Sequence, residues 1–237
     1  MNLILLYESD FTDSTAGIAR LSGRRMEHAI SVCKVRVGTT LRVGLVNGNI
    51  GKAKVLSLSG NSLAISVVLD EVPPTPLPLI LIIAMPRPKS FLKCLEAATI
   101  MGVKKMYFIH SYRVEKHYWG SQKILKKSIE EHIHLGLEQA RDTMIPAIEF
   151  RRRFKPFFED EIQEIIKGTK ALVAHPYAAQ PCPHNVQCPV TLAIGPEGGF
   201  IPYEIDMMKR RGFEAISLGE RILRVEHAIP ALIGRLL

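Results

Sequence analysis

Hydrophobic and polar positions follow two different patterns along the chain. Up to residue 72 the apolar residues form short runs, which turn-forming residues separate. Asn47-Gly48-Asn49 lies between two of these runs and is typical of a hairpin, because Asn and Gly accept positive φ. Many short strands in one short segment predict a small β-barrel. The expected strands are Leu3–Tyr7, Thr40–Val46, Ile50–Leu58 and Ser62–Leu69, with one helix over Arg24–Val35.

A group of closely spaced prolines follows this segment, at Pro73, Pro74, Pro76 and Pro78. Prolines at this density cannot continue a helix or a central strand, and they favour extended backbone. We therefore predict a barrel domain over residues 1–72, a Pro-rich linker over 73–78 and a second domain over 79–237.

Beyond the prolines, apolar runs alternate with amphipathic stretches. Leu79–Ala84 and Val190–Ile194 are continuous apolar runs, which are typical of strands buried on both faces of a parallel sheet. Strands that alternate with helices predict an α/β domain with a largely parallel sheet. Further strands are expected at 105–109, 147–150, 171–174 and 215–218, and helices at 89–101, 122–141, 157–166, 203–211 and 225–237.

The charge of the chain is positive and unevenly placed. Lys and Arg number 31 against 23 Asp and Glu, which gives a net charge of +8. Residues 77–156 hold 15 of the basic and 7 of the acidic side chains, so the excess lies in the middle third. A basic surface attracts polyanions, of which nucleic acid is the commonest. A solvated face of lysines is the alternative.

Neither export nor membrane insertion is expected. The N-terminal apolar run lacks a basic region and soon meets acidic residues, and Pro76–Pro86 is too short to cross a bilayer. The scattered cysteines then read as reduced thiols of a cytoplasmic protein. Cys182, His184 and Cys188 have the chemistry of zinc ligands, but no fourth ligand is spaced nearby, so we expect a loop and no metal.

Two loops near the C-terminus are the main candidates for chemistry. Gly195-Pro196-Glu197-Gly198-Gly199-Phe200 follows a buried strand, and Leu218–Ala228 follows another. Ligands of open α/β sheets bind at the carboxyl ends of strands. The first loop lacks both the P-loop and the dinucleotide signatures, and Glu197 would repel phosphate. It suits a neutral or cationic ligand, or it is a structural turn that closes the strand.

Taken together, Gly-Pro-Glu-Gly-Gly-Phe at 195–200 and Arg-Ile-Leu-Arg at 221–224 resemble the RsmE-type 16S rRNA uridine N3-methyltransferases, which belong to the SPOUT superfamily. Leu21–Ala29, Val35–Gly38 and Ala97–Val103 extend the resemblance over nearly the whole chain. It implies an α/β SPOUT domain with a trefoil knot, preceded by a PUA-like barrel. It also implies S-adenosylmethionine as cofactor, 16S rRNA of the small ribosomal subunit as partner, and a homodimer.

The resemblance further implies a role for each region. The cofactor would be held by Leu172, Ala174, His175, Ile194, Gly195, Pro196, Glu197, Gly198, Gly199, Leu218, Gly219, Arg221, Ile222 and Leu223. Arg224, or alternatively Arg221, would stabilise negative charge on the uracil oxygens, as an oxyanion site does. Glu226 is the favoured residue to orient the uracil or to accept the N3 proton, with Glu197 and His227 as the other candidates for proton acceptor. A structural ion pair is the alternative for each of these charged residues.

The chain departs from the family at residues 86–90, at the helix position Glu96 or Ala97, and in one segment that bears on catalysis. Arg224-Val225-Glu226-His227-Ala228 stands where the family commonly reads Arg-Thr-Glu-Thr-Ala, so two hydroxyls are missing. An rRNA-binding or ribosome-assembly protein that kept the fold and lost activity is therefore the competing interpretation.

Contacts to rRNA phosphates are expected from both predicted domains. The candidates are Arg20, Arg24, Arg25 and Arg36 in the first, and Arg87, Lys89 and Lys93 in the second. Tyr112, Tyr118 and Trp119 lie near this charge and either stack on bases or pack in the core. The apolar residues of the terminal helix are candidates for the dimer surface.

Overall fold

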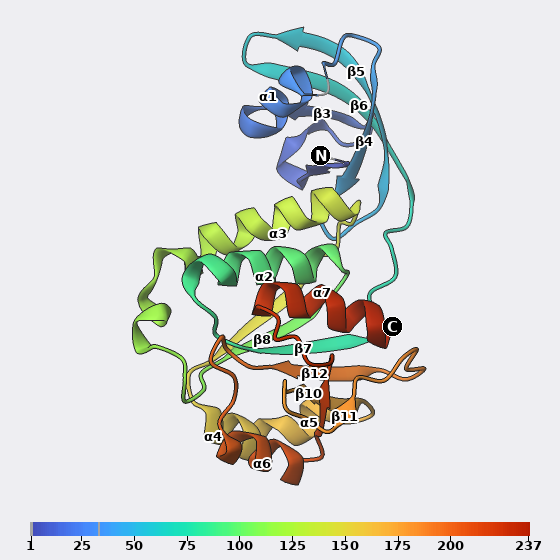
Figure 1. The fold of residues 1–237 in the computed structure, drawn as a ribbon. Coiled ribbons are helices and arrows are strands. Elements are labelled where there is room, and N and C mark those ends of the chain that lie inside the picture. The colour runs from blue at the N-terminus through green and yellow to red at the C-terminus, as the bar shows by residue number, and fades with distance from the viewer. Residues whose placement is uncertain (1, 33) are drawn as a thin grey trace. The chain divides into compact units, whose positions relative to one another are not determined.

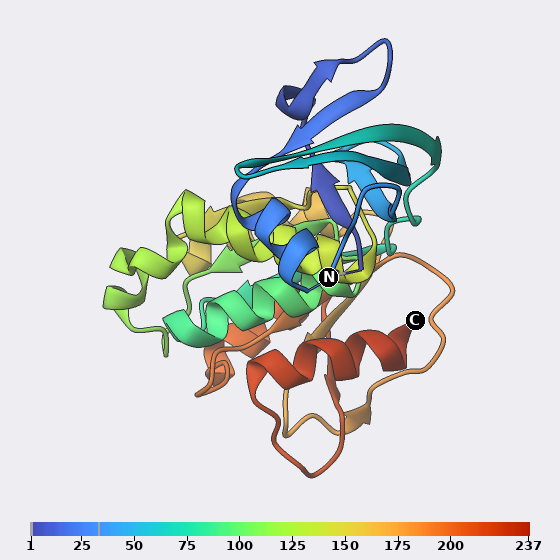
Figure 2. The same ribbon diagram turned by 90° about the horizontal axis from the view of Figure 1, so that it is seen from above.

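The computed structural model describes residues 2–32 and 34–237, and the chain divides into two compact units (Figures 1 and 2). The first consists of Met1–Thr75 together with His134–Ile145, and the second of Pro76–Ile133 with Pro146–Leu237. The first unit is therefore assembled from two segments that lie far apart in the sequence.

A six-stranded sheet in the order β1-β4-β5-β6-β3-β2 forms the first unit. The strands are β1 (Ile4–Leu6), β2 (Phe11–Asp13), β3 (Ile18–Leu21), β4 (Thr40–Leu45), β5 (Ile50–Ser59) and β6 (Ser62–Glu71), accompanied by the 3-10 turn η1 (Glu8–Asp10) and by α1 (Gly23–Ser31). The four expected strands are confirmed. β2 and β3 were not predicted, because with 3 and 4 residues they are too short to show an alternating pattern. Their pairing is also irregular in register.

The register of β5 against β6 shifts at two points, between Ile50 and Lys52 and between Val55 and Ser57. Gly51 lies at the first of them. A Cβ on Gly51 would approach the carbonyl oxygen of Val68 to 1.9 Å, so only glycine fits there. β1 and β2 form the two ends of the sheet, and the pairing of the described strands leaves it open. The expected small β-barrel is therefore not confirmed.

The segment His134–Ile145 is held to the β4–β5 hairpin by hydrogen bonds. The N–H of Asn47 donates to the carbonyl of Thr143 at 2.8 Å, and the Thr143 hydroxyl donates to the carbonyl of Gly48 at 2.5 Å. Glu138 is only 2% exposed and accepts hydrogen bonds of 3.1 Å from the guanidinium of Arg24 in α1. These contacts satisfy a buried carboxylate that the hydrophobic pattern gave no reason to expect.

A seven-stranded sheet in the order β11-β13-β10-β12-β7-β8-β9 forms the second unit, and all its pairs are parallel. Its strands are β7 (Leu79–Ala84), β8 (Lys105–Ile109), β9 (Ala147–Arg151), β10 (Lys170–Ala174), β11 (Gln180–Pro181), β12 (Val190–Ile194) and β13 (Glu214–Ser217). Because the pairs are parallel, the segments that follow these strands emerge at one side of the sheet, here called the carboxyl edge.

Helices cover both faces of this sheet, with α2 and α7 on one face and α4, α5 and α6 on the other (Figure 1). Their bounds are α2 (Pro88–Ile100), α3 (Lys126–Ala140), α4 (Phe154–Pro156), α5 (Ile162–Ile166), α6 (Pro202–Arg210) and α7 (Val225–Leu236), with the short helices η2 (Lys116–Gly120), η3 (Gln122–Ile124) and the π-helical η4 (Phe157–Glu161). The expected α/β architecture with a parallel sheet is confirmed.

Most strands and helices of the second unit match the expected periodicity closely. The helix expected over 157–166 is divided into α4, η4 and α5, and the helix expected over 122–141 begins at Lys126 behind the separate turn η3. The short strand β11 and the short helix η2 were not predicted. Buried aromatic rings fill the space beneath α2, where Phe91 meets Phe108 edge to face at 4.7 Å between ring centroids. β7 and β12 lie at the centre of the sheet, and both were predicted with their observed bounds.

Candidate functional site

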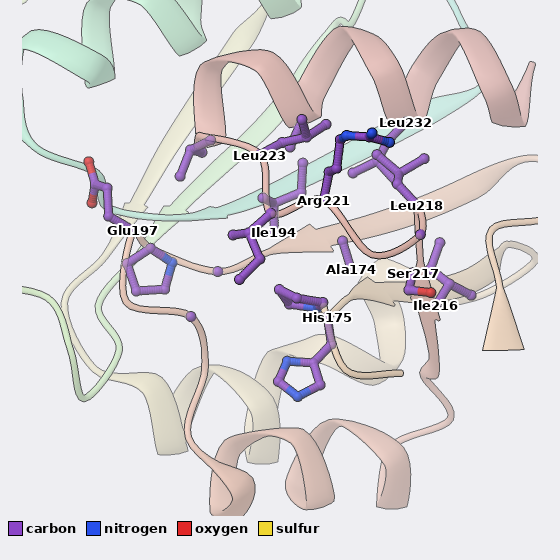
Figure 3. Close-up of a pocket in the computed structure, with 18 residues that line it drawn as sticks. Ala174, His175, Ile194, Glu197, Ile216, Ser217, Leu218, Arg221, Leu223 and Leu232 are labelled. Carbon is purple, nitrogen blue, oxygen red and sulfur yellow. The ribbon is translucent and has the colours of Figure 1, made fainter. Parts of the chain in front are cut away.

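A pocket opens at the carboxyl edge of the second unit, between the ends of β10, β12 and β13 and the first turns of α7 (Figure 3). The structure brings together here all but two of the residues expected to hold the cofactor. They are Ala174, His175, Ile194, Gly195, Pro196, Glu197, Gly199, Leu218, Gly219, Arg221, Ile222 and Leu223.

The two exceptions lie close by but do not line the pocket. Leu172 is wholly buried within β10, so its side chain belongs to the core. Gly198 is on the exposed outer side of its loop, and its carbonyl accepts a hydrogen bond from the guanidinium of Arg113.

Six lining residues were not predicted. They are Pro176, Ile216, Ser217, Val225, Ala228 and Leu232. The first three adjoin predicted residues at strand ends, where the same rule about carboxyl ends would have included them. Val225, Ala228 and Leu232 recur at spacings of 3 and 4 along α7, which is one face of a helix. The sequence showed this face of the helix, but it did not show that the face lies beside the two loops.

Residues 195–200 form a tight turn directly after β12. The N–H of Gly199 donates to the carbonyl of Pro196 at 2.7 Å, and Gly199 has φ +71°, a conformation that favours glycine. A Cβ on Gly195 would lie 3.0 Å from the backbone nitrogen of Phe200, so a side chain there would crowd the turn. The turn therefore presents bare backbone to the pocket.

Glu197 stands at one end of the pocket, with Ile216 and Ser217 at the other (Figure 3). Its side chain is exposed, and one carboxylate oxygen accepts a 3.0 Å hydrogen bond from the backbone N–H of Arg87. This bond fixes the loop after β12 to the loop after β7.

His175 supplies an unsatisfied polar group to the pocket wall. Its Nδ1 is buried and has no hydrogen-bond partner among the residues that the structure describes. Burial, followed by the nearby charge of Lys209, lowers the pKa of His175 below its usual value, so the ring is neutral at pH 7. Buried polar atoms are nearly always paired, so this nitrogen fits a hydrogen bond to a bound ligand.

Of the expected catalytic residues, Glu197 lines the pocket, whereas Arg224 and Glu226 flank it. Arg224 is the exposed N-cap residue of α7, between the lining residues Leu223 and Val225. Within residues 2–32 and 34–237, neither Arg224 nor Arg221 has its guanidinium engaged in an ion pair or hydrogen bond. Both cations are therefore available to an anionic group at the pocket mouth.

Glu226 lies in the first turn of α7, where a carboxylate complements the helix dipole. The residue is 8% exposed, and its Oε1 lies 4.0 Å from Nζ of Lys93 in α2. Its Oε2 is buried and has no partner in the described part of the chain. One half of this carboxylate is thus in a helix–helix ion pair, and the other half remains able to accept a proton or a hydrogen bond.

The free space in the pocket is about 100 Å³, whereas pockets for drug-sized ligands hold ~300–1,000 Å³. One wall consists of the stretch between β13 and α7, where Ile222 is 64% and Leu223 41% exposed. Because these side chains are so exposed, we expect this stretch to be the part of the wall that moves outward for a larger ligand.

The basic residues expected to bind RNA fall into two groups. Among the described residues, Arg20, Arg36, Arg87 and Lys89 have exposed side chains without an ion pair, and Lys93, also exposed, lies 4.0 Å from Glu226. Arg24 pairs with Glu138 and Arg25 with Asp10, and Arg25 also lies over the ring of Tyr7 at 4.9 Å. The second group therefore has structural partners that the sequence did not reveal.

The aromatic candidates also separate. Trp119 is 9% exposed and donates its indole N–H to Nδ1 of His110 at 3.0 Å, so it packs in the core. Tyr112, in contrast, is 78% exposed.

The apolar side chains of α7 that we expected at a dimer surface, among them Ile229 and Leu236, are buried inside the protomer. That expectation is corrected, because these side chains form the packing of α7 onto its own unit.

Among the described residues, no three His, Cys, Asp or Glu side chains gather as they would around a metal ion. Cys182 is buried and Cys188 is exposed. No described helix has the length and apolar character needed to cross a membrane.

Comparisons with known proteins bear on the same region. The family model for the RNA methyltransferase domain matches residues 73–237, which include the whole pocket. The ribosomal RNA small subunit methyltransferase E of Treponema pallidum is 26% identical over 98% of this chain and 88% of its own length. The protein with the same name from Mesomycoplasma hyopneumoniae is 30% identical over 66% of this chain and 68% of its own.

A solved structure has the same fold. The ribosomal RNA small subunit methyltransferase E from Neisseria gonorrhoeae, bound to S-adenosyl methionine, is 19% identical to this chain and superposes with a TM-score of 0.74 over 98% of this chain and 95% of its own. The family model covers most of the sequence and all of the pocket-lining residues. The chain therefore belongs to the RNA methyltransferase domain family.

Proposed function

We propose that this protein transfers a methyl group from S-adenosylmethionine to N3 of a uridine in the rRNA of the small ribosomal subunit. The observation that carries the proposal is the pocket of bare backbone and aliphatic side chains at the carboxyl edge, with the unpartnered nitrogen of His175 in its wall. The names of the curated relatives support the small-subunit rRNA as substrate.

The composition of the pocket fits this cofactor. The turn at 195–200 allows close approach to backbone, and Leu218, Ile222 and Leu223 offer an apolar slot for a flat ring. The sulfonium is positive, so a carboxylate such as Glu197 at one end of the pocket is compatible with it, whereas it would repel a phosphate. When bound, the cofactor supplies an electrophilic methyl group.

The protein's own residues would prepare the acceptor. Uracil N3 carries a proton and must lose it as the new N–C bond forms. Arg224, exposed and unpaired beside the pocket, would stabilise negative charge on the uracil oxygens. The unpartnered Oε2 of Glu226 would accept the proton or orient the base, with Lys93 holding the other oxygen. Alignment of the methyl carbon with N3 would supply much of the remaining rate.

We propose that the exposed basic side chains Arg20, Arg36, Arg87, Lys89 and Lys93 contact rRNA phosphates. We further propose the PUA-like character of the first domain over residues 1–72, the linker 73–78, a trefoil-knotted SPOUT domain over 79–237, and a homodimer. The resemblance to the methyltransferase family carries these features, and a dimer surface other than the buried face of α7 is required.

One observation favours a second function. Val225 is 4% exposed and lines the pocket. The RsmE-type methyltransferases that this chain resembles commonly carry a threonine at this position. A non-catalytic rRNA-binding or assembly protein would tolerate this loss. Such a protein would bind RNA but would leave uridine unmethylated.

The test is methyl transfer from labelled S-adenosylmethionine to small ribosomal subunits isolated from cells that lack the gene. We expect one uridine to gain label, and N3-methyluridine to disappear from that position on gene deletion and return on complementation. Label at a different atom would overturn the N3 assignment. If no label is transferred although calorimetry shows that the cofactor binds, the non-catalytic function is favoured.

A further inference from the structure

A second cavity opens at the carboxyl edge, on the other side of the turn at 195–200. It lies between the segment after β8, the start of α4 and the N-terminus of α6, and it measures about 800 Å³, within the range of ~300–1,000 Å³ for ligand pockets. None of the residues lining the cofactor pocket also lines this cavity. The proposed transfer reaction therefore leaves it without a role.

The inner wall of the cavity carries polar groups that are not satisfied by the protein. Ser111 is 0% exposed, and its hydroxyl has no hydrogen-bond partner among the described residues. His110 accepts a hydrogen bond at Nδ1 from the Trp119 indole, so a neutral ring carries its proton on Nε2. Burial and the charge of Lys116 lower the pKa of His110 and keep the ring neutral. The wall thus holds an imidazole N–H and, out of contact with solvent, an unpaired hydroxyl.

The outer walls are aromatic, and the rim carries lysines together with one exposed glutamate, Glu115. Tyr112 is 78% exposed and Tyr203 51% exposed, although both line the cavity. Lys116 and Lys155 also line it and have exposed side chains. Exposed tyrosine faces beside lysines match a flat ring that is joined to phosphates.

Two hydrogen bonds make the cavity a preformed site. The Glu204 carboxylate is 3% exposed and accepts the backbone N–H of Tyr112 at 2.8 Å and that of Ile201 at 3.0 Å, which joins the β8 loop to the start of α6. The guanidinium of Arg113 donates to the carbonyl of Gly198 on the outer side of the glycine turn. One turn therefore separates two pockets that open along the same edge.

We propose that this cavity binds the base of a nucleotide next to the target uridine, stacked on Tyr112 or Tyr203 and with its polar edge toward Ser111 and His110. The proposal rests on the proposed function, because it takes the RNA strand to run along the carboxyl edge past the cofactor pocket. It requires the RNA to be single-stranded at the site, since bases within an A-form helix are not free to enter a cavity.

The experiment uses full-length protein and oligouridylate that carries one photoreactive 4-thiouridine, with binding measured by fluorescence anisotropy and crosslinks mapped by mass spectrometry. We expect crosslinks at the cavity residues. Tyr112→Ala should weaken RNA binding about tenfold, as loss of one stacked base does, whereas Tyr112→Phe retains the ring and should bind like the wild type.

Ser111→Ala distinguishes a ligand-binding hydroxyl from a structural one. A buried hydroxyl without a partner contributes nothing to folding, so its removal should leave the melting temperature unchanged or raised while RNA affinity falls. A variant that loses both stability and affinity would indicate a structural role and overturn the assignment. Affinity for S-adenosylmethionine, measured by calorimetry, should be unchanged in both the Ser111 and the Tyr112 variants.

The two proposals fail in different ways. If the wild type methylates small-subunit rRNA but Tyr112→Ala changes neither RNA affinity nor the crosslinks, the base-binding cavity is wrong and the enzyme assignment stands. If the wild type methylates nothing, but crosslinks appear at the cavity and Tyr112→Ala weakens binding, the base-binding cavity stands and the enzyme assignment is wrong. Binding of free uridine monophosphate as tight as that of the oligonucleotide would also overturn the proposal, because it would indicate an independent small-molecule site.

Discussion

The backbone N–H of Arg87 donates a 3.0 Å hydrogen bond to the carboxylate of Glu197. Arg87 follows β7 and Glu197 follows β12, and these two strands are neighbours at the centre of the sheet. The carboxylate therefore has a positioning role in the loop that does not depend on any ligand. An acceptor oxygen is needed for this role, but a negative charge is not.

Substitution of Glu197 separates these two properties. Glu197→Gln keeps an acceptor oxygen for Arg87, so we expect cofactor affinity close to that of the wild type. Glu197→Ala removes the acceptor and should weaken binding by roughly 2- to 10-fold, which corresponds to the ~0.5–1.5 kcal/mol of an ordinary hydrogen bond. Calorimetry measures both. Equal losses in the two variants would show instead that the charge beside the sulfonium is what matters.

Arg224→Ala should reduce methyl transfer by a factor of about 10²–10³, as the loss of an oxyanion-stabilising group does. Folding should be nearly unaffected, because the side chain is exposed. Arg210→Ala is a matched control, since Arg210 is an exposed arginine in the last turn of α6 and lines neither pocket. Retained turnover in Arg224→Ala, measured with labelled cofactor, would remove Arg224 from the catalytic residues.

Cofactor affinity should fall as the pH is lowered through the pKa of His175, which lies below the unperturbed histidine value of about 6.5. His175 is neutral above that pH, and its lowered pKa means that protonation occurs further down the acid range. Protonation then places a positive charge in the wall of a pocket for a cationic ligand. The same lowered pKa makes the folded state bind fewer protons than the unfolded chain, so His175 also costs stability as the pH falls.

His175→Gln is the variant that tests this pH dependence. It keeps a hydrogen-bonding side chain but does not titrate. Its cofactor affinity, measured by calorimetry, should therefore vary less as the pH falls from neutral to well below the unperturbed histidine pKa of about 6.5, where His175 with its lowered pKa titrates. An unchanged pH profile would assign the titration to another group.

Arg24 and Arg36 should respond differently to substitution by alanine. Arg24→Ala leaves the Glu138 carboxylate, 2% exposed, without its guanidinium partner. The expected loss is about 1–3 kcal/mol in the free energy of unfolding. Arg36→Ala should leave unfolding unchanged and weaken RNA binding, with a smaller salt dependence. Denaturant titration and RNA binding at several salt concentrations distinguish these outcomes, and stability losses in both variants would contradict the expectation.

Binding of S-adenosylmethionine should slow hydrogen exchange in residues 218–224 more than elsewhere in the second unit. This stretch must move to enlarge a pocket of about 100 Å³, and it then closes over the ligand. Exchange measured by mass spectrometry with and without cofactor checks this. Protection confined to the turn at 195–200 would indicate that the pocket enlarges on the other side.

The sequence predicted those features that depend on local pattern. β7 and β12 are continuous apolar runs because both faces of each are covered, so their bounds were evident, and the loops that follow them carried recognisable glycines. The sequence could not predict the unpartnered atoms of His175, Ser111 and Glu226. An atom lacks a partner because the folded chain brings no donor or acceptor next to it, and this depends on the three-dimensional arrangement. The ion pair of Arg24 with Glu138 joins residues 114 positions apart, which no periodicity reveals.

The assignment of His134–Ile145 to the first unit has a consequence for the order of synthesis. On the ribosome, residues 1–75 emerge long before the segment that supplies Glu138 to Arg24 and Thr143 to the β4–β5 hairpin. The first unit therefore cannot reach its final form until residue 145 has left the exit tunnel, by which time β7, β8 and α2 of the second unit have already emerged. A gene fragment that ends at the prolines would encode an N-terminal unit whose last structural segment is missing.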